Sequence, residues 1–141
     1  MLDEELAATI RERLRTSTFA RWMGMELLDV GDGFSEMRLH VSEHHLNPGG
    51  IVHGGVIATI LDSSIGVALR TRLDLDRTHV TVNLSIGYLR PLRVGTMVAR
   101  AHAVHSGDRI GYGEADVFDE EGTLLARGTA TFLVVPRPRS P

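Results

Sequence analysis

The chain of 141 residues contains no cysteine, and all 15 of its basic residues are arginine, so lysine is absent as well. Without cysteine there is no thiol nucleophile, disulfide, iron–sulfur cluster or thiolate zinc site. Without lysine there is no P-loop lysine, no Schiff-base lysine and no Ser-x-x-Lys nucleophile. These two absences therefore exclude whole classes of chemistry before any motif is sought.

Length and charge narrow the possibilities further. At 141 residues with 43% hydrophobic residues, one domain spanning 1–141 is expected. The net charge of −3 argues against a general nucleic-acid binder, which needs a clustered basic surface. The acidic start is unlike a secretory or transit signal, so a cytoplasmic location is predicted. His53 and Asp62 interrupt the longest apolar stretch, which argues against a membrane span.

Hydrophobic periodicity predicts two helices and several strands. An amphipathic N-terminal helix is expected within 1–18, and a longer helix over 54–69 that is apolar almost all round. A loop rich in His, Asn, Pro and Gly covers 43–53, and a loosely ordered tail covers 136–141. The predicted strands are 25–30, 37–42, 78–88, 97–104, 109–118 and 124–135.

The last three strands carry small residues on one face. These are Ala99, Ala101, Ala103, Gly111, Gly113, Ala115, Ala126, Gly128 and Ala130. A face this small lets a helix lie close against the sheet. The sequence therefore predicts an α+β fold, in which the apolar helix is wrapped by an antiparallel sheet of five to six strands.

Asp62 is the only charged residue within the apolar helix. A carboxylate removed from water is costly unless it is paired, protonated or facing a cavity. Asp62 is therefore a candidate catalytic residue. The alternative is a structural carboxylate that hydrogen-bonds to nearby backbone, or a helix that is less buried than the pattern indicates.

The residues before this helix, 47–55, read Asn-Pro-Gly-Gly-Ile-Val-His-Gly-Gly. Backbone N–H groups in the first turn of a helix lack intrahelical acceptors, so this start could form an oxyanion hole. A glycine-rich turn that merely enters the helix is the alternative. Gly54 and Asp62 lie about 12 Å apart along the helix, at roughly 1.5 Å per residue. Both can act on one carbonyl only if two copies of the helix combine, which predicts a homodimer with shared active sites.

The pattern Asn47, Gly50, His53-Gly54-Gly55 and Asp62 resembles the PaaI-type hotdog-fold acyl-CoA thioesterases. The likeness extends over about 19–135. It implies a hotdog fold in which protomers pair into dimers, and dimers into tetramers. It also implies hydrolysis of an acyl-CoA without metal or cofactor.

Carried over by position, the resemblance makes Asp62 the nucleophile or the general base that activates water. The N–H of Gly54 would polarise the thioester carbonyl, and Asn47 would orient the water or leaving group. Thr81, a looser match, would be an auxiliary polar group. Asn47 and Gly54 would come from one protomer, and Asp62 and Thr81 from the other.

Four further residues are assigned to substrate binding: His53, Gly55, Arg90 and Arg93. His53 is expected to shape the helix entrance, with a general-base role as the alternative. Arg90 and Arg93 could meet the phosphates of CoA, or could be solvated loop residues.

Other functions stay open on sequence alone. A metal site built from His40, His44, His45, His53 and Glu43 is disfavoured because the spacing lies on a strand and a loop. A serine hydrolase lacks its Gly-x-Ser-x-Gly motif. A hotdog dehydratase or hydratase, or a non-catalytic acyl-CoA-binding or regulatory protein, would share the fold.

Overall fold

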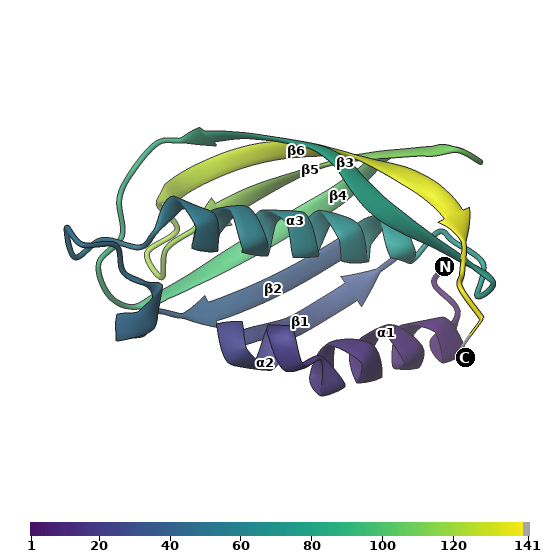
Figure 1. The fold of residues 1–141 in the computed structure, drawn as a ribbon, viewed down its shortest axis with the longest axis horizontal. Helices are drawn as coiled ribbons and strands as arrows, with labels where there is room; N and C mark the ends of the chain where they lie inside the picture. The colour runs from purple at the N-terminus through teal and green to yellow at the C-terminus, as the bar shows by residue number, and fades with distance from the viewer. Residues whose placement is uncertain (140–141) are drawn as a thin grey trace.

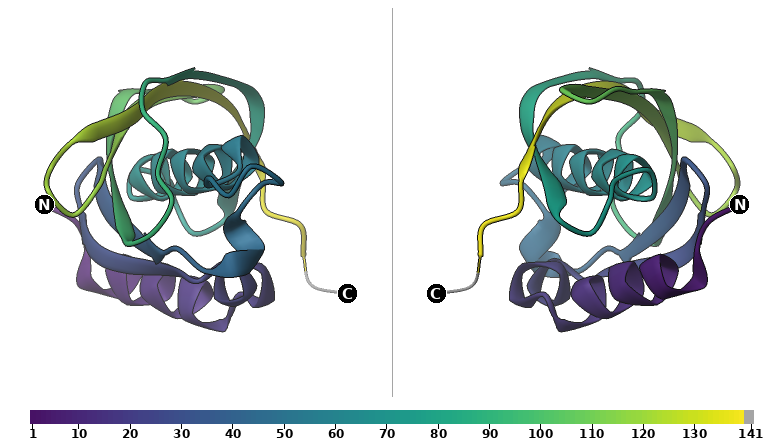
Figure 2. Two further views of the ribbon diagram at one scale, coloured as in Figure 1. Left: turned by 90° about the vertical axis from the view of Figure 1, so that its left-hand side faces the viewer. Right: turned by 90° about the vertical axis from the view of Figure 1, so that its right-hand side faces the viewer.

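The computed structural model describes residues 1–139 and shows one antiparallel sheet of six strands curled around a central helix (Figure 1). The strand order is β1-β2-β4-β5-β6-β3. Seen end-on, the sheet bends around α3 from β1 to β3, which form its two edges (Figure 2). The predicted α+β architecture is confirmed.

The elements follow one another in this order: α1 (Glu4–Thr16), α2 (Thr18–Met23), β1 (Met25–Gly31), β2 (Phe34–His40), a single 3-10 turn (Glu43–His45), α3 (Gly54–Arg70), β3 (Arg77–Tyr88), β4 (Thr96–Ser106), β5 (Ile110–Phe118) and β6 (Leu124–Pro136).

The N-terminal segment forms two helices where the sequence predicts one. The side chain of Asp3 caps α1 by accepting from the N–H groups of Glu5 and Leu6. Ser17 then caps α2 by accepting from the N–H of Ala20, and Gly24 ends α2 at a φ of 77°. A helix of six residues is too short to show a periodic pattern, so α2 was not predicted.

The central helix α3 is buried along most of its circumference, as its apolar sequence predicts. Ile60, Leu61 and Ile65 are fully buried within the main hydrophobic cluster. One stripe of α3 is less covered and consists of Gly54, Gly55, Ala58, Thr59, Asp62, Ser63 and Val67. The helix therefore has one open side, and Asp62 lies on it.

Small residues on the sheet allow the close approach of α3. A Cβ built on Gly113 would lie 2.7 Å from Ile65 Cγ2, and one on Gly128 would lie 3.2 Å from Leu61 Cδ1. The stripe of alanine and glycine read from the last three strands is thus the surface on which α3 packs.

We expect Gly113→Ala to lower the free energy of unfolding by about 1–3 kcal/mol, because the new methyl group overpacks the core. The backbone oxygen of His102, only 2.9 Å from the added Cβ, prevents β5 from shifting away freely. Urea denaturation would measure the change. Gly31→Ala is a matched control, since its Cβ would meet only Phe34 at 4.0 Å. Equal losses in the two variants would contradict the close-packing explanation.

The end of the chain is attached to the loop before β3. The N–H of Arg137 donates to the carbonyl of Asp76. Of the loose tail predicted over 136–141, residue 136 is the last of β6, and residues 140–141 lie outside the described part. Among residues 1–139, no helix combines the length and the hydropathy needed to cross a membrane.

Candidate active site

Asp62 is hydrogen-bonded to Thr81 on the open side of α3. The hydroxyl of Thr81 on β3 donates to Asp62 Oδ1 at 2.7 Å. No donor within residues 1–139 occupies Oδ2. The carboxylate is half-buried and lines a hollow of about 320 Å³ between α1, α3 and β3. The sequence prediction that Asp62 is paired or faces a cavity is met on both counts.

A β-bulge between Thr81 and Asn83 turns the Thr81 side chain toward α3. Thr81 is paired with the buried Phe132, so both face the helix. After the extra residue Val82, Leu84 is paired with Ala130 on the same side. Val80, Val82, Leu84, Ile86 and Tyr88 alternate with polar or small residues in the sequence, but the bulge interrupts this alternation because it shifts the two-residue period by one.

The start of α3 leaves one backbone donor unused. His53 is the N-cap residue, and its Nδ1 accepts from the N–H of Gly55 at 2.8 Å. The N–H of Val56 donates to the carbonyl of His53. Among residues 1–139, the Gly54 N–H meets no acceptor. Gly54 is consequently the donor of this turn that is available to a ligand, and His53 shapes the turn.

Tyr88 is a site residue that the sequence analysis missed. Its hydroxyl, at the end of β3, donates to the Gly54 carbonyl at 2.6 Å. A Cβ on Gly54 would lie 3.3 Å from this phenol, so glycine at this position allows the close contact. No local pattern in the sequence indicates that Tyr88 reaches the start of α3.

Asn47 organises the loop that precedes α3. Its Oδ1 accepts from the N–H groups of Gly49 and Ile51 at 2.9 and 3.3 Å. The Arg93 guanidinium lies against the same loop, with Nη1 3.4 Å from the Gly49 carbonyl oxygen. Arg90 is exposed, and its backbone N–H donates to Leu125 O. Among residues 1–139, the amide nitrogen of Asn47 meets no acceptor, so it is left for other partners.

His45 anchors the other end of this loop. It is 1% exposed, its Nδ1 accepts from the Ser42 N–H, and its Nε2–H donates to Met23 O at 2.7 Å. Nδ1 must accept, so the neutral ring is the form that satisfies both contacts. Burial lowers the pKa of His45, with a smaller contribution from His44 and an opposing one from the Met23 carbonyl.

We expect stability to fall as the pH is lowered below about 6.5, the ordinary histidine value. The pKa of His45 is lowered in the folded chain, so the unfolded chain binds the proton first and is favoured at acidic pH. Urea denaturation between pH 8 and 5 would measure how steeply the free energy of unfolding falls with pH. This slope should be shallower in His45→Gln. His102→Gln, an exposed control, should keep the wild-type slope. An unchanged slope in His45→Gln would contradict this account.

The remaining histidines near this loop have separate partners. His40 Nδ1 contacts the Thr96 hydroxyl, and the His44 ring lies 5.5 Å from the Trp22 ring. Among residues 1–139, no three histidine or carboxylate side chains cluster as metal ligands.

The predicted site residues thus form two separate groups within one chain. Asp62 and Thr81 are together midway along α3, whereas Asn47, His53, Gly54, Gly55 and Arg93 gather at its start. Gly54 and Asp62 are eight positions apart, which is about 12 Å along the helix. One chain therefore does not bring the Gly54 N–H and the Asp62 carboxylate to the same point.

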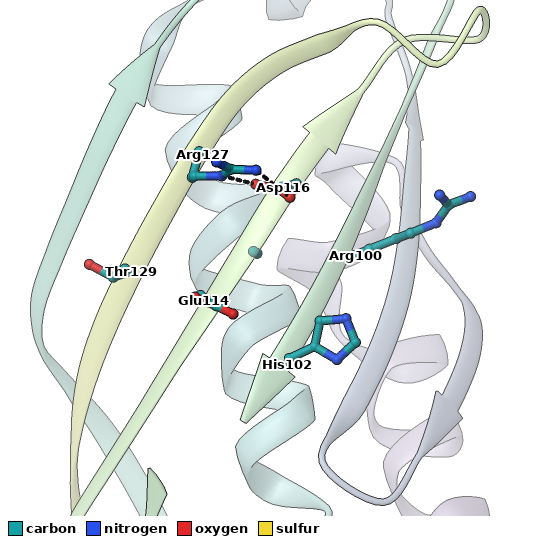
Figure 3. A pocket seen from close by; sticks show the side chains of 7 residues that line it. Arg100, His102, Glu114, Asp116, Arg127 and Thr129 are labelled. Carbon is teal, nitrogen blue, oxygen red and sulfur yellow. Dashed lines mark hydrogen bonds and ion pairs between the residues drawn. The ribbon is translucent and has the colours of Figure 1, made fainter. Parts of the chain in front are cut away.

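A second hollow of about 320 Å³ lies on the opposite face of the sheet. Figure 3 shows Arg100, His102, Glu114 and Arg127 on the strand face turned away from α3. The Asp116 carboxylate there is bound to the Arg127 guanidinium at 2.6 Å. This hollow shares no residue with the Asp62 group, so it is a separate surface feature.

The chain is similar to known proteins over most of its length. The sequence model of the thioesterase superfamily matches residues 49–126. A curated relative from Halobacterium salinarum, named provisionally as an esterase, is 34% identical over 144 residues, covering 93% of each chain. The human protein named acyl-coenzyme A thioesterase 13 is 27% identical over 133 residues, covering 92% of this chain and 94% of the relative.

Solved structures agree with this similarity. A variant of the phenylacetic acid degradation protein PaaI from Thermus thermophilus superposes with a TM-score of 0.76 at 29% identity. The superposition covers 83% of this chain and 98% of that one.

Proposed function

Because the chain belongs to the thioesterase superfamily and has its hotdog fold, we propose that it hydrolyses a small-to-medium or aromatic acyl-CoA to the free acid and CoA. The observation that carries the proposal is the Asp62 carboxylate, held by Thr81 at the edge of a hollow on the open side of α3. A thioester carbonyl is reactive enough that one carboxylate and an oxyanion donor suffice.

Each active site would combine two protomers. Asp62 and Thr81 from one chain would face Asn47 and Gly54 from the other, because the two groups are too far apart within a chain. The edge strand β3 supports this arrangement, since it is 12 residues long and exposes Val80 (48%) and Val82 (56%). A long apolar edge is an aggregation hazard unless another strand covers it, and β3 of a second copy is the natural cover.

In the proposed reaction the Gly54 N–H of one protomer donates to the thioester oxygen and stabilises the oxyanion. The free Oδ2 of Asp62 from the other protomer takes a proton from water while the water oxygen forms a bond to the carbonyl carbon. The carbon–sulfur bond then breaks, and the proton passes to the departing thiolate. Direct attack by Asp62, with hydrolysis of the resulting anhydride, is the other route to the same products.

Supporting roles follow from the contacts at the start of α3. His53 and Tyr88 hold the first turn so that the Gly54 N–H points outward, and Gly55 contributes to that turn through His53. The amide nitrogen of Asn47 would hold the water or the leaving group. Arg93, and Arg90 further along the same segment, would meet CoA phosphates. Pairing of dimers into a tetramer, as the PaaI resemblance implies, completes the proposed assembly.

A panel of acyl-CoA esters tests the proposal directly. Short-chain, long-chain and aromatic esters are supplied, and released CoA is followed with a thiol reagent. The chain has no cysteine, so the reagent detects only the product. Release from at least one class is expected. CoA binding without release from any ester would instead favour an acyl-CoA-binding or regulatory protein. Hydration of an enoyl-CoA would favour a dehydratase.

A further inference from the structure

The hollow beside Asp62 extends along α3 toward an arginine at the helix end. Asp62 and Ser63 line one part of it, and Arg70, the last residue of α3, lines another together with Arg13 of α1. Between them the walls are mainly apolar, with Leu14, Val67 and Phe132 among the lining residues. Asp62 and Arg70 are eight residues apart, or about 12 Å along the helix axis.

Arg70 is buried and forms no ion pair with a carboxylate within residues 1–139. Its residue surface is 7% exposed. Nη1 donates to the carbonyls of Leu73 and Asp74 at 2.9 and 3.3 Å, whereas Nη2 is buried and has no acceptor within residues 1–139. Long charged side chains are rarely buried unless they are paired, and a buried donor without an acceptor is destabilising.

Other positive charges lie close to Arg70. Burial lowers its pKa, and the nearby charges of Arg137 and Arg13 lower it further, while Asp74 acts in the opposite direction. Arg137 also has a buried Nη2 without an acceptor within residues 1–139. All ion pairs found within residues 1–139 involve arginines other than Arg13, Arg70 and Arg137. The guanidinium groups of Arg70, Arg13 and Arg137 thus lie close together, and none of them forms an ion pair within residues 1–139.

We propose that the hollow accepts an acyl group whose far end is a carboxylate, so that the substrates are ω-carboxyacyl thioesters. With the thioester carbonyl at Asp62, the methylene chain would lie along the apolar walls. The terminal carboxylate would reach Arg70 and Arg13, and a carboxylate–guanidinium contact is among the stronger hydrogen bonds in proteins. This inference rests on the proposed thioesterase function and specifies its substrate class.

The phosphates of CoA are the other anions that could meet these arginines. They lie beyond the pantetheine arm, on the side of the sulfur away from the acyl group. The apolar walls and the burial of Arg70 suit an acyl chain better than a phosphate exposed to water. An experiment with thioesters that lack phosphate separates the two sources.

The test compares acyl groups of equal length with and without the terminal carboxylate. Adipoyl and suberoyl thioesters are paired with hexanoyl and octanoyl thioesters, each prepared both on CoA and on N-acetylcysteamine. We expect kcat/KM to favour the carboxylated member by on the order of tenfold or more in both series. Equal or lower values for the carboxylated members would overturn the inference.

Arg13→Gln is the informative variant, because Arg13 is exposed and its loss leaves the core intact. It should reduce the preference for carboxylated chains in both series, whereas Arg11→Gln on the same helix, which does not line the hollow, should retain it. Arg70→Gln, if it folds by circular dichroism, should reduce the preference further. An unchanged preference in Arg13→Gln would overturn the inference.

The remaining outcomes are also decisive. A loss confined to the CoA series would assign the arginines to phosphate and overturn the acyl proposal. Hydrolysis of all esters without preference would overturn the substrate class and leave the thioesterase function standing. No hydrolysis of any thioester would overturn the proposed function, and this inference with it.

Discussion

Asp62→Asn is expected to lower kcat for the best acyl-CoA substrate by about 10²–10⁴, the usual contribution of a positioned general acid or base. The carboxamide has the same shape and can still accept from the Thr81 hydroxyl, so the fold and the assembly should be retained. It cannot take a proton from water, and it is a poor nucleophile, so both routes to products would fail.

Size-exclusion chromatography and circular dichroism would show that the Asp62→Asn protein is still assembled and folded. Thr81→Val is the matched variant, because it removes the 2.7 Å hydrogen bond but keeps the carboxylate. Its loss should be much smaller than that of Asp62→Asn. Wild-type turnover in Asp62→Asn would sink the assignment of Asp62 as the reacting group.

Mixing two inactive variants should restore activity if each site is built from two chains. Gly54→Pro is the second variant, because proline fits the first position of a helix but has no N–H to serve as the oxyanion donor. Loss of one such donor costs on the order of 10²–10³ in rate. In a mixed dimer, one site would pair the intact Asp62 of the Gly54→Pro chain with the intact Gly54 of the Asp62→Asn chain.

When equal amounts of the two variants are unfolded together and refolded, random pairing makes half of the dimers mixed. One of the two active sites in each mixed dimer is intact. Activity should therefore return to about a quarter of the wild-type value, as two-fold symmetry requires. Each variant unfolded and refolded alone is the control, and should stay inactive. No recovery in a mixture shown to contain mixed dimers would mean that the two groups act within one chain.

The fold could be predicted from the sequence because its signals are strong and agree with each other. The apolar stretch over 54–69 with its single carboxylate favours an enclosed helix by its length, and the alanine and glycine stripe shows which sheet face receives it. The similarity to PaaI, predicted from the residues between Asn47 and Asp62, is confirmed by the family match and the solved structures.

The details that stayed hidden depend on contacts between distant segments. Tyr88 reaches Gly54 across 34 residues of sequence, and no local pattern announces such a hydrogen bond. Arg70 directly follows the helix predicted over 54–69, and a basic residue is common there because the carbonyl groups at a helix end attract cations. Its burial depends on the packing of the neighbouring elements, which periodicity does not describe. The roles of the predicted site residues remain predictions.

The bulge in β3 lets one strand serve two chemically different purposes. On one side of Val82 the inward positions carry polar groups, with Thr81 beside the carboxylate, and on the other side they carry Leu84 and Ile86 in the core. In a regular strand every second residue faces the helix. Thr81 and Leu84 are three residues apart, so without a bulge they would face opposite sides of the sheet. A strand that kept Val82 but lost the bulge would turn either the Thr81 hydroxyl away from Asp62 or the apolar residues away from the core, so this one extra residue links the position of Thr81 to the stability of the sheet.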